Sequence, residues 1–201
     1  MNVIAITGSP RKGQATDRLV DAALQGCLER APESRFRKIA LIDLDIRHCR
    51  NCLTCRDNPA TPYAPCPIKD DMQGLYPEIE AADALIMGTP VHMGTATGLM
   101  QCFLERICWV FAKPEGRYFT VRGCPVPRTN KRRKAVILVV SGLVPPLYRR
   151  FCDEATGLIR CTLRDSLNCR TVGDMYAGAV LYKGVERYLA KARQLGRRLV
   201  G

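Results

Sequence analysis

The chain has 201 residues, a formal net charge of +12 and 11 cysteines. This length suits one domain, or one domain with an insertion, and allows a substantial core. The odd cysteine count, spread over a chain with 47% hydrophobic residues, argues against a small secreted disulfide scaffold. No apolar run approaches the roughly 18 to 20 residues of a membrane span, and the short apolar start is no signal peptide, so we expect a soluble protein of the reducing cytoplasm.

The basic residues are densest at 128–134 and 193–198. Neither patch carries the interleaved aromatic residues of a base-stacking surface or a recognisable DNA- or RNA-reading motif. We interpret both as solvated faces and expect neither a nucleic-acid nor a membrane partner. A basic surface also favours approach of anionic small molecules or of an acidic protein.

Apolar runs alternate with helical patterns along the chain, which is typical of a parallel sheet wrapped by helices. Strands are expected at residues 2–7, 38–44, 83–88, 134–141 and 171–175. Helices are expected at residues 16–30, 72–81, 98–109, 147–165 and 180–200. The pattern predicts a single domain over 1–201, with a cysteine loop at 47–72 and an irregular insertion at about 113–133. That insertion fits an active-site lid, a subunit-contact arm or a plain surface excursion.

A polar turn, residues 7–16, follows the first expected strand and opens the first helix. Such a turn directs backbone N–H groups and the positive end of the helix to one spot, where hydroxyls and Arg11 add donors for a phosphate. Gly13 is followed by Gln14, so the turn is neither a Walker A loop nor a G-x-G-x-x-G fingerprint. These absences argue against a nucleotide triphosphatase and against a dinucleotide-binding Rossmann domain.

Four cysteines lie in the next loop, Cys49, Cys52, Cys55 and Cys66. Two successive C-x-x-C steps let consecutive sulfurs turn toward one centre, and a later Cys-Pro supplies a fourth ligand. The spacing favours iron–sulfur over zinc, because structural zinc more often divides its ligands into two separated pairs. Ordinary reduced thiols remain the alternative.

A second polar loop, residues 88–97, follows the third expected strand. In a sheet of order 2-1-3-4-5, strands one and three flank the crevice where ligands bind. Pro90 and Gly94 let the backbone approach a ligand closely, and His92 lies between them. The first loop can therefore hold a phosphate while this one lies along a flat ring.

Together these segments resemble the NAD(P)H-dependent FMN reductases and, within them, the iron–sulfur flavoproteins. The matching pieces are residues 8–16, the cysteine run, residues 66–72 and residues 89–106. The resemblance implies a flavodoxin-like α/β fold, a three-layer sandwich with a five-stranded parallel sheet of order 2-1-3-4-5. Ala15 stands where the family often has Asn, and the Gly-rich segment after strand four is reduced here to Ser141 and Gly142.

The resemblance also implies roles for individual residues. Residues expected to contact the FMN phosphate are Ser9, Arg11, Gln14, Ala15 and Thr16. Residues expected along the flavin ring are Pro90, Val91, His92, Met93 and Gly94, with Ser141 and Gly142 after strand four. The expected metal ligands are Cys49, Cys52, Cys55 and Cys66, for a [4Fe-4S] cluster. No side chain is expected to be catalytic, because the flavin carries the chemistry.

We therefore expect an FMN-dependent NAD(P)H oxidoreductase that passes electrons between flavin and cluster. Its partner would be a small molecule or a protein, such as a ferredoxin-like carrier. Because a monomer need not bring its own cysteine loop over its own flavin, we expect a homodimer or homotetramer. The alternatives are a cluster-free FMN or quinone reductase, a non-enzymatic electron carrier, and a zinc-stabilised binding domain.

Overall fold

The computed structural model describes residues 1–201, and its centre is a parallel sheet. Five strands run in the order β2-β1-β3-β7-β8, which is 2-1-3-4-5 when the parallel strands are counted along the chain. Their bounds are β1 Asn2–Thr7, β2 Arg35–Ala40, β3 Ala84–His92, β7 Arg133–Val140 and β8 Cys169–Ala177. The predicted flavodoxin-like α/β class and this strand order are confirmed.

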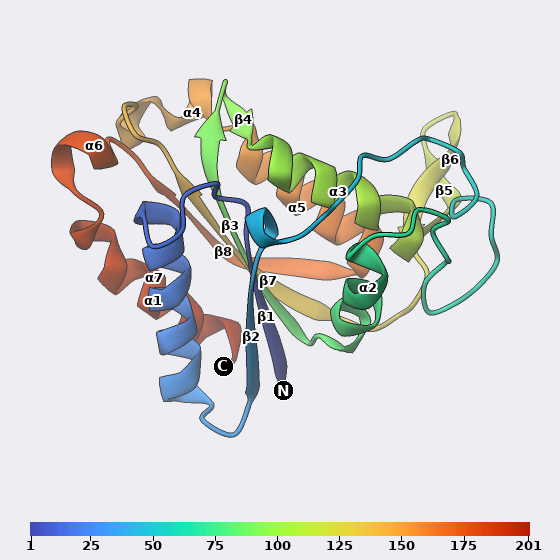
Figure 1. The fold of residues 1–201 in the computed structure, drawn as a ribbon, viewed down its shortest axis with the longest axis horizontal. Coiled ribbons are helices and arrows are strands. Elements are labelled where there is room, and N and C mark those ends of the chain that lie inside the picture. Colours follow the sequence, from blue (N-terminus) through green and yellow to red (C-terminus); the bar gives the residue numbers. More distant parts are fainter.

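Helices cover both faces of the sheet (Figure 1). One face packs against α1 (Ala15–Arg30) and α7 (Glu186–Leu199). The other packs against α2 (Met72–Ala81), α3 (Gly98–Phe111) and α5 (Ala155–Leu167). Because both faces are buried, the strands are apolar at almost every position. None of the helices is long and apolar enough to cross a bilayer.

Strand β1 shows how the sequence builds the two cores. Val3 and Ala5 point into the cluster with α1 and α7, whereas Ile4 and Ile6 point into the cluster with α2, α3 and α5. Consecutive side chains of a strand alternate between faces, so an unbroken apolar run is what a doubly covered strand requires. The strand and helix predicted at residues 2–7 and 72–81 match the structure residue for residue.

Several predicted elements differ in extent from the structure, and the strands predicted at 83–88 and 171–175 are longer, as β3 and β8. The second strand, predicted at 38–44, is β2 at Arg35–Ala40, because this edge strand exposes Arg35, Arg37 and Lys38 and lacks a continuous apolar run. The helix predicted at 147–165 is divided into the 3₁₀ turn η2 (Pro146–Tyr148), α4 (Arg149–Cys152) and α5.

The break before α5 has a side-chain cause. The Asp153 carboxylate accepts a hydrogen bond from the Thr156 backbone N–H at 2.9 Å, which competes with a continuous helix. The helix predicted at 180–200 is likewise divided, into α6 (Val180–Lys183) and α7, at Gly184 with φ +69°. Glycine ends α6 there because other residues rarely adopt this backbone conformation.

The insertion predicted as irregular is instead an antiparallel hairpin. It comprises β5 (Ala112–Tyr118) and β6 (Val121–Pro127), and it lies away from the main sheet (Figure 1). Register shifts beside Gly116 and the many prolines hid its strand pattern from the sequence. The two-residue β4 (Thr95–Ala96), antiparallel to β3, is a further strand that the sequence did not predict.

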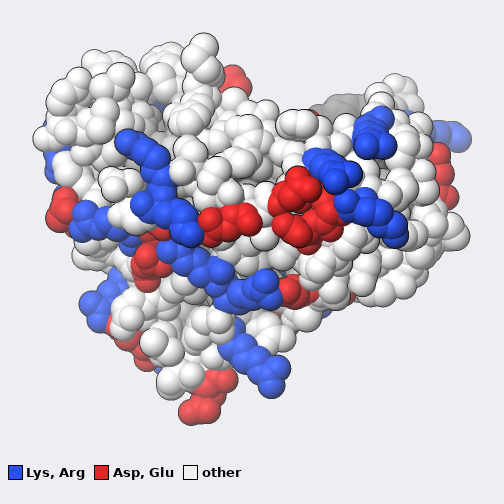
Figure 2. Space-filling view, in the orientation of Figure 1, with Lys and Arg blue, Asp and Glu red and all other residues white.

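Charges are mixed over the middle of the face shown in Figure 2, while the upper edge carries mainly uncharged residues. Many of the basic residues are paired, as in Lys12 with Asp43 and Arg193 with Glu29.

Helices α1 and α7 approach each other to backbone contact. A Cβ at Gly26 would lie 1.9 Å from Arg193 O, and a Cβ at Gly196 would lie 1.9 Å from Ala23 O. The Cys27 thiol donates to Gly196 O at 3.2 Å in the same contact, and burial raises its pKa to about 12. This reciprocal glycine contact sets the distance between the two helices.

We expect Gly26→Ala to lower the free energy of unfolding by about 1 to 3 kcal/mol, because the added methyl group meets backbone that cannot rotate away. Gly74→Ala is the matched control, since nothing lies within 4 Å of its Cβ in helix α2. There the better helix propensity of alanine should stabilise by up to about 1 kcal/mol. Urea unfolding of the three proteins measures both values, and equal stability of the two variants would contradict the packing argument.

Candidate functional site

The loop between β1 and α1 presents unpaired N–H groups. The first hydrogen bond of α1 runs from Arg18 N to Gln14 O at 3.0 Å, so the N–H groups of Gln14, Ala15 and Thr16 have no helical acceptor. Such groups, at the positive end of a helix, bind anions. Ala15 therefore contributes through its backbone although it lacks a side-chain donor.

The side chains of Arg11, Gln14 and Thr16 line a cavity of about 220 Å³ beside these N–H groups. None of the three side chains makes a hydrogen bond or ion pair with the rest of the chain. Ser9 is different, because its hydroxyl donates to Arg11 O at 3.0 Å and accepts from Arg11 N at 3.2 Å. Ser9 shapes the loop, while the other three leave their donors free for a ligand.

Asp17 is a site residue that the sequence analysis missed. Its carboxylate is 6% exposed and accepts from Gly13 N at 2.8 Å, where Gly13 turns the loop with φ +71°. Lys38 Nζ faces the other oxygen of Asp17 at 3.2 Å. Burial works to lower the pKa of Lys38, but hydrogen bonds to Asp21 and Asp17 outweigh this and raise it. The charged lysine offsets the carboxylate, so Asp17 fixes the loop without repelling an anion.

The rest of the cavity wall is mainly apolar and comes from the carboxyl ends of three strands. Its remaining lining residues are Ser9, Pro10, Ala15, Pro90, Val91, His92, Val140, Gly142, Val180 and Leu181. The cavity thus has a donor-rich end at the first loop and an apolar slot beyond it. This arrangement suits a flat ring that carries a phosphate on a flexible arm.

Nine of the residues predicted for the cofactor line this one cavity, namely Ser9, Arg11, Gln14, Ala15, Thr16, Pro90, Val91, His92 and Gly142. Met93, Gly94 and Ser141 are not in its wall. Met93 and Gly94 form the tip of the turn between β3 and β4, and Met93 is fully exposed. The buried Ser141 hydroxyl accepts from Val144 N at 3.2 Å.

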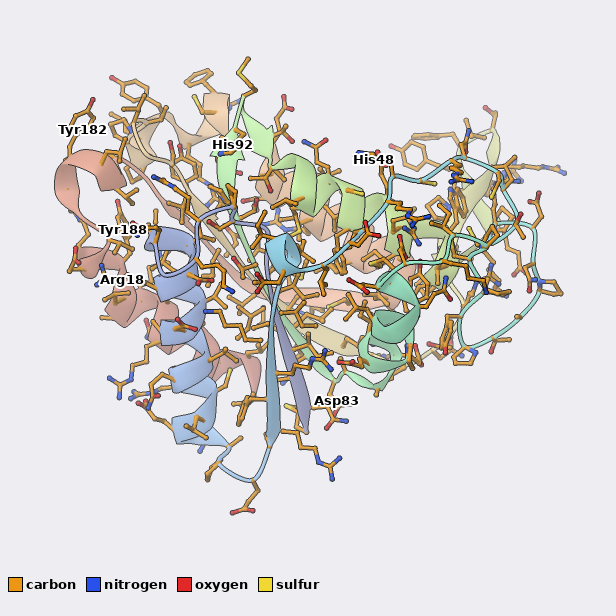
Figure 3. The ribbon with its side chains drawn as sticks, in the orientation of Figure 1. Arg18, His48, Asp83, His92, Tyr182 and Tyr188 are labelled. Carbon is orange, nitrogen blue, oxygen red and sulfur yellow. The ribbon has the colours of Figure 1, made fainter.

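The cavity also uses residues that sequence reasoning did not assign. Val180 and Leu181 follow β8 and close the slot from α6. In Figure 3, Tyr182 on α6 and His92 at the end of β3 lie at the same edge of the sheet. An apolar pair directly after the last strand was the available signal, because parallel strands share one carboxyl edge.

Thr97 joins the two ligand loops. Its hydroxyl donates to Gly8 O at 2.7 Å and accepts from Met100 N at 3.3 Å, so it also caps α3. A Cβ at Gly8 would lie 2.8 Å from Met100 Cβ, which explains why glycine stands there. The loops after β1 and β3 are therefore fixed to each other.

The predicted metal ligands lie outside this cavity. Cys49, Cys52, Cys55 and Cys66 are free thiols in residues 44–71, which form neither helix nor strand. His48, in the same loop, lies toward the β5–β6 hairpin in Figure 3. No group of three or more His, Cys, Asp or Glu side chains is close enough to hold a metal ion in this structure.

The four thiols nevertheless share one neighbourhood. Burial raises the pKa of Cys55 to about 11, and the charges of Cys66, Cys49 and Cys52 add to the rise. The donors match an iron–sulfur cluster in kind and number, while their sulfurs are not drawn together here.

A family model for the NADPH-dependent FMN reductases matches residues 1–142, which include the whole cavity wall except α6. The chain belongs to this family. An iron–sulfur flavoprotein of Methanosarcina thermophila is 33% identical over 106 residues, covering 53% of this chain and 52% of that protein. The chain therefore spans about half the length of the curated relatives it matches.

Solved structures agree on the fold. An NAD(P)H:quinone oxidoreductase from Methanothermobacter marburgensis superposes with a TM-score of 0.70 at 18% identity, over 100% of this chain and 96% of that one. An FMN-dependent NADH-azoreductase from Bacillus anthracis, solved with FMN, gives 0.70 at 11% identity over 100% of both chains. At these identities the likeness concerns the fold alone.

We expect Asp17→Ala to weaken binding of FMN, the ligand in the family's name, by about tenfold. One hydrogen bond to a charged group contributes roughly 1.5 kcal/mol, and 1.4 kcal/mol is a factor of ten. Asp21→Ala is the control, because it removes the other carboxylate on Lys38 without touching the loop. Fluorescence titration gives both affinities, and equal affinities would show that Asp17 does not order the loop.

Proposed function

We propose that the protein binds FMN in the cavity at the carboxyl edge of the sheet and catalyses NAD(P)H-dependent reduction. One observation carries the proposal. The side chains of Arg11, Gln14 and Thr16 make no hydrogen bond within the chain, and they lie beside three free N–H groups at one end of an apolar slot. Unpaired donors converging on one point favour a phosphate, and the family match favours FMN as its bearer.

Each part of the cavity has a role in this proposal. Arg11 and the N–H groups of Gln14 to Thr16 bind the phosphate, and Asp17 keeps their loop in place. Pro90, Val91 and Val140 form the wall along the ring, while Leu181 borders it from α6. Bound FMN supplies the redox chemistry, accepting a hydride from NAD(P)H and passing electrons on. The side chains bind, orient and shield.

The test is the FMN content and activity of the Arg11→Ala variant. We expect it to lose at least about tenfold in FMN affinity, because a charge-assisted phosphate contact is removed. NADH or NADPH oxidation with a quinone or free flavin as acceptor should fall with FMN occupancy. Arg35→Ala changes the charge equally at the amino end of β2, outside the cavity, and should leave both unchanged.

The outcomes separate the alternatives. A wild-type protein that takes up no FMN would contradict the proposal. FMN binding without stimulated NAD(P)H oxidation would indicate an electron carrier. A colourless protein loaded with zinc would indicate a zinc-stabilised binding domain.

We further propose that Cys49, Cys52, Cys55 and Cys66 hold a [4Fe-4S] cluster. Four free thiols, three of them in C-x-x-C-x-x-C spacing, support this, as does the name of the Methanosarcina relative. The loop must draw the sulfurs together when the metal binds, and a segment without helix or strand can do so more readily than one within regular structure. Iron and sulfide content of protein purified without oxygen distinguishes this site from zinc or free thiols.

We also propose that two or more copies assemble through the edge around the cavity, and that the electron partner, a small molecule or a protein, approaches there. Seven large apolar side chains that follow β3, β7 and β8 are exposed: Met93, Leu143, Leu147, Tyr148, Phe151, Leu181 and Tyr182. Figure 2 shows few charges along this edge. Exposed apolar side chains that follow neighbouring strands support association, and none of the four cysteines lies in the cavity wall of the same copy.

Light scattering tests the assembly. We expect the wild type to be a dimer or tetramer and Phe151→Glu, which charges a side chain that is 82% exposed, to shift it toward monomer. Leu28→Glu, on the exposed side of α1, should not change the mass. A monomeric wild type would refute the proposed assembly.

A further inference from the structure

The cysteine loop, residues 44–71, contains no helix or strand. Two buried arginines anchor it instead. Arg106 lies on α3 and is 2% exposed, and Arg128 follows β6 and is 9% exposed. The two guanidinium groups donate hydrogen bonds to different parts of the loop, and each contacts one of the proposed cysteine ligands, Cys66 or Cys55. Neither arginine lines the FMN cavity.

Arg106 binds both ends of the loop. Its NH1 donates to Arg47 O at 2.7 Å, and its NH2 donates to Cys66 Sγ at 3.6 Å and to Asp70 Oδ1 at 3.1 Å. Its NH2 also donates to the Tyr76 hydroxyl at 3.3 Å, and an arginine side chain stays protonated in proteins. Arg106 is therefore a fixed cation that touches the sulfur of Cys66.

Arg128 binds the middle of the loop through carbonyl groups alone. Its NH1 donates to Asn58 O at 2.7 Å and Ala60 O at 2.9 Å, and its NH2 donates to Cys55 O at 2.7 Å. It forms no salt bridge, although an unpaired buried charge is costly. A neutral side chain could donate the same hydrogen bonds to these carbonyl groups. The unpaired positive charge of Arg128 therefore needs a separate explanation.

The two arginines share one further feature. The Nε atoms of Arg106 and Arg128 are both buried and have no hydrogen-bond partner. Buried donors without an acceptor are rare in folded proteins, and each calls for an explanation such as a bound water, ion or charged group. Of the two buried guanidinium groups, that of Arg106 pairs with the Asp70 carboxylate, whereas that of Arg128 has no carboxylate partner.

We propose that Arg106 and Arg128 are positioning residues that anchor the cysteine loop and supply fixed positive charge for an anionic metal–thiolate group. The inference rests on the proposed cysteine site. Thiolates around a metal centre would provide the negative charge that Arg128 lacks, and they would add to the charge of Asp70 beside Arg106. Positive charge near a cluster stabilises its reduced, more negative state, so both arginines should raise its reduction potential.

The first test uses the metal-free protein. In Arg128→Met, iodoacetamide should alkylate Cys55 several-fold faster than in the wild type, because the loop loses its central anchor; peptide mass spectrometry gives the rate at each cysteine. Arg122→Met, an equal charge change on an exposed position of β6, is the control and should leave the rate unchanged. Unchanged alkylation in Arg128→Met would overturn the positioning role.

The second test follows anaerobic reconstitution with iron and sulfide. Arg128→Met and Arg106→Met should retain less iron, and their remaining cluster should be reduced at a more negative potential in a spectroelectrochemical titration. Arg128→Lys and Arg106→Lys keep the positive charge but not the full set of guanidinium hydrogen bonds. Their reduction potential should therefore return closer to the wild-type value than their iron content does. They also serve if a methionine variant does not fold.

Failure of this inference and failure of the cysteine site are distinguishable. Equal iron content and equal potential in wild type and variants would overturn the role of the arginines while the cluster stands. A wild type that binds no metal would overturn the cysteine site together with this inference, and FMN content, measured on the same samples, would still judge the flavin proposal.

Discussion

Burial of both faces of the parallel sheet is the constraint on which the rest of the structure depends. Parallel strands need long crossovers, and the helices that form them cover both faces. Every strand then ends at the same edge, so the loops after β1, β3, β7 and β8 meet there and leave one cavity between them. Helices α1 and α7 share one face of the sheet, and Gly26 and Gly196 let their backbones come into direct contact there.

The two functional loops use their donors in opposite ways. The first loop leaves Arg11, Gln14 and Thr16 without partners in the chain, while Asp17 and Thr97 fix the backbone beneath them. The cysteine loop has no regular structure, and Arg106 and Arg128 commit most of their donors to holding it. A preformed loop with free donors suits a ligand that arrives complete, whereas an anchored but open loop suits a centre that assembles in place.

The sequence could predict elements whose own residues carry the signal. Strand β1 and helix α2 were predicted to the residue, because a doubly buried strand is continuously apolar and an amphipathic helix repeats every 3.6 residues. The helix predicted at 147–165 failed because a side chain, Asp153, competes for the backbone of Thr156. The hairpin β5–β6 was missed since its glycines and prolines shift the register and hide the alternation.

The same division holds for the site. The sequence by itself determined the α/β class and the candidate phosphate loop, because these depend on apolar period and on residue types close together in the chain; the order of the parallel strands came from the resemblance to the FMN reductases. Only the tertiary structure decided that Asp17 orders the loop with the help of Lys38, that Val180 and Leu181 close the slot, and that Arg106 and Arg128 anchor the cysteines. These contacts join residues far apart in sequence, and a buried charge reveals its partner, or the lack of one, only when the chain around it is folded.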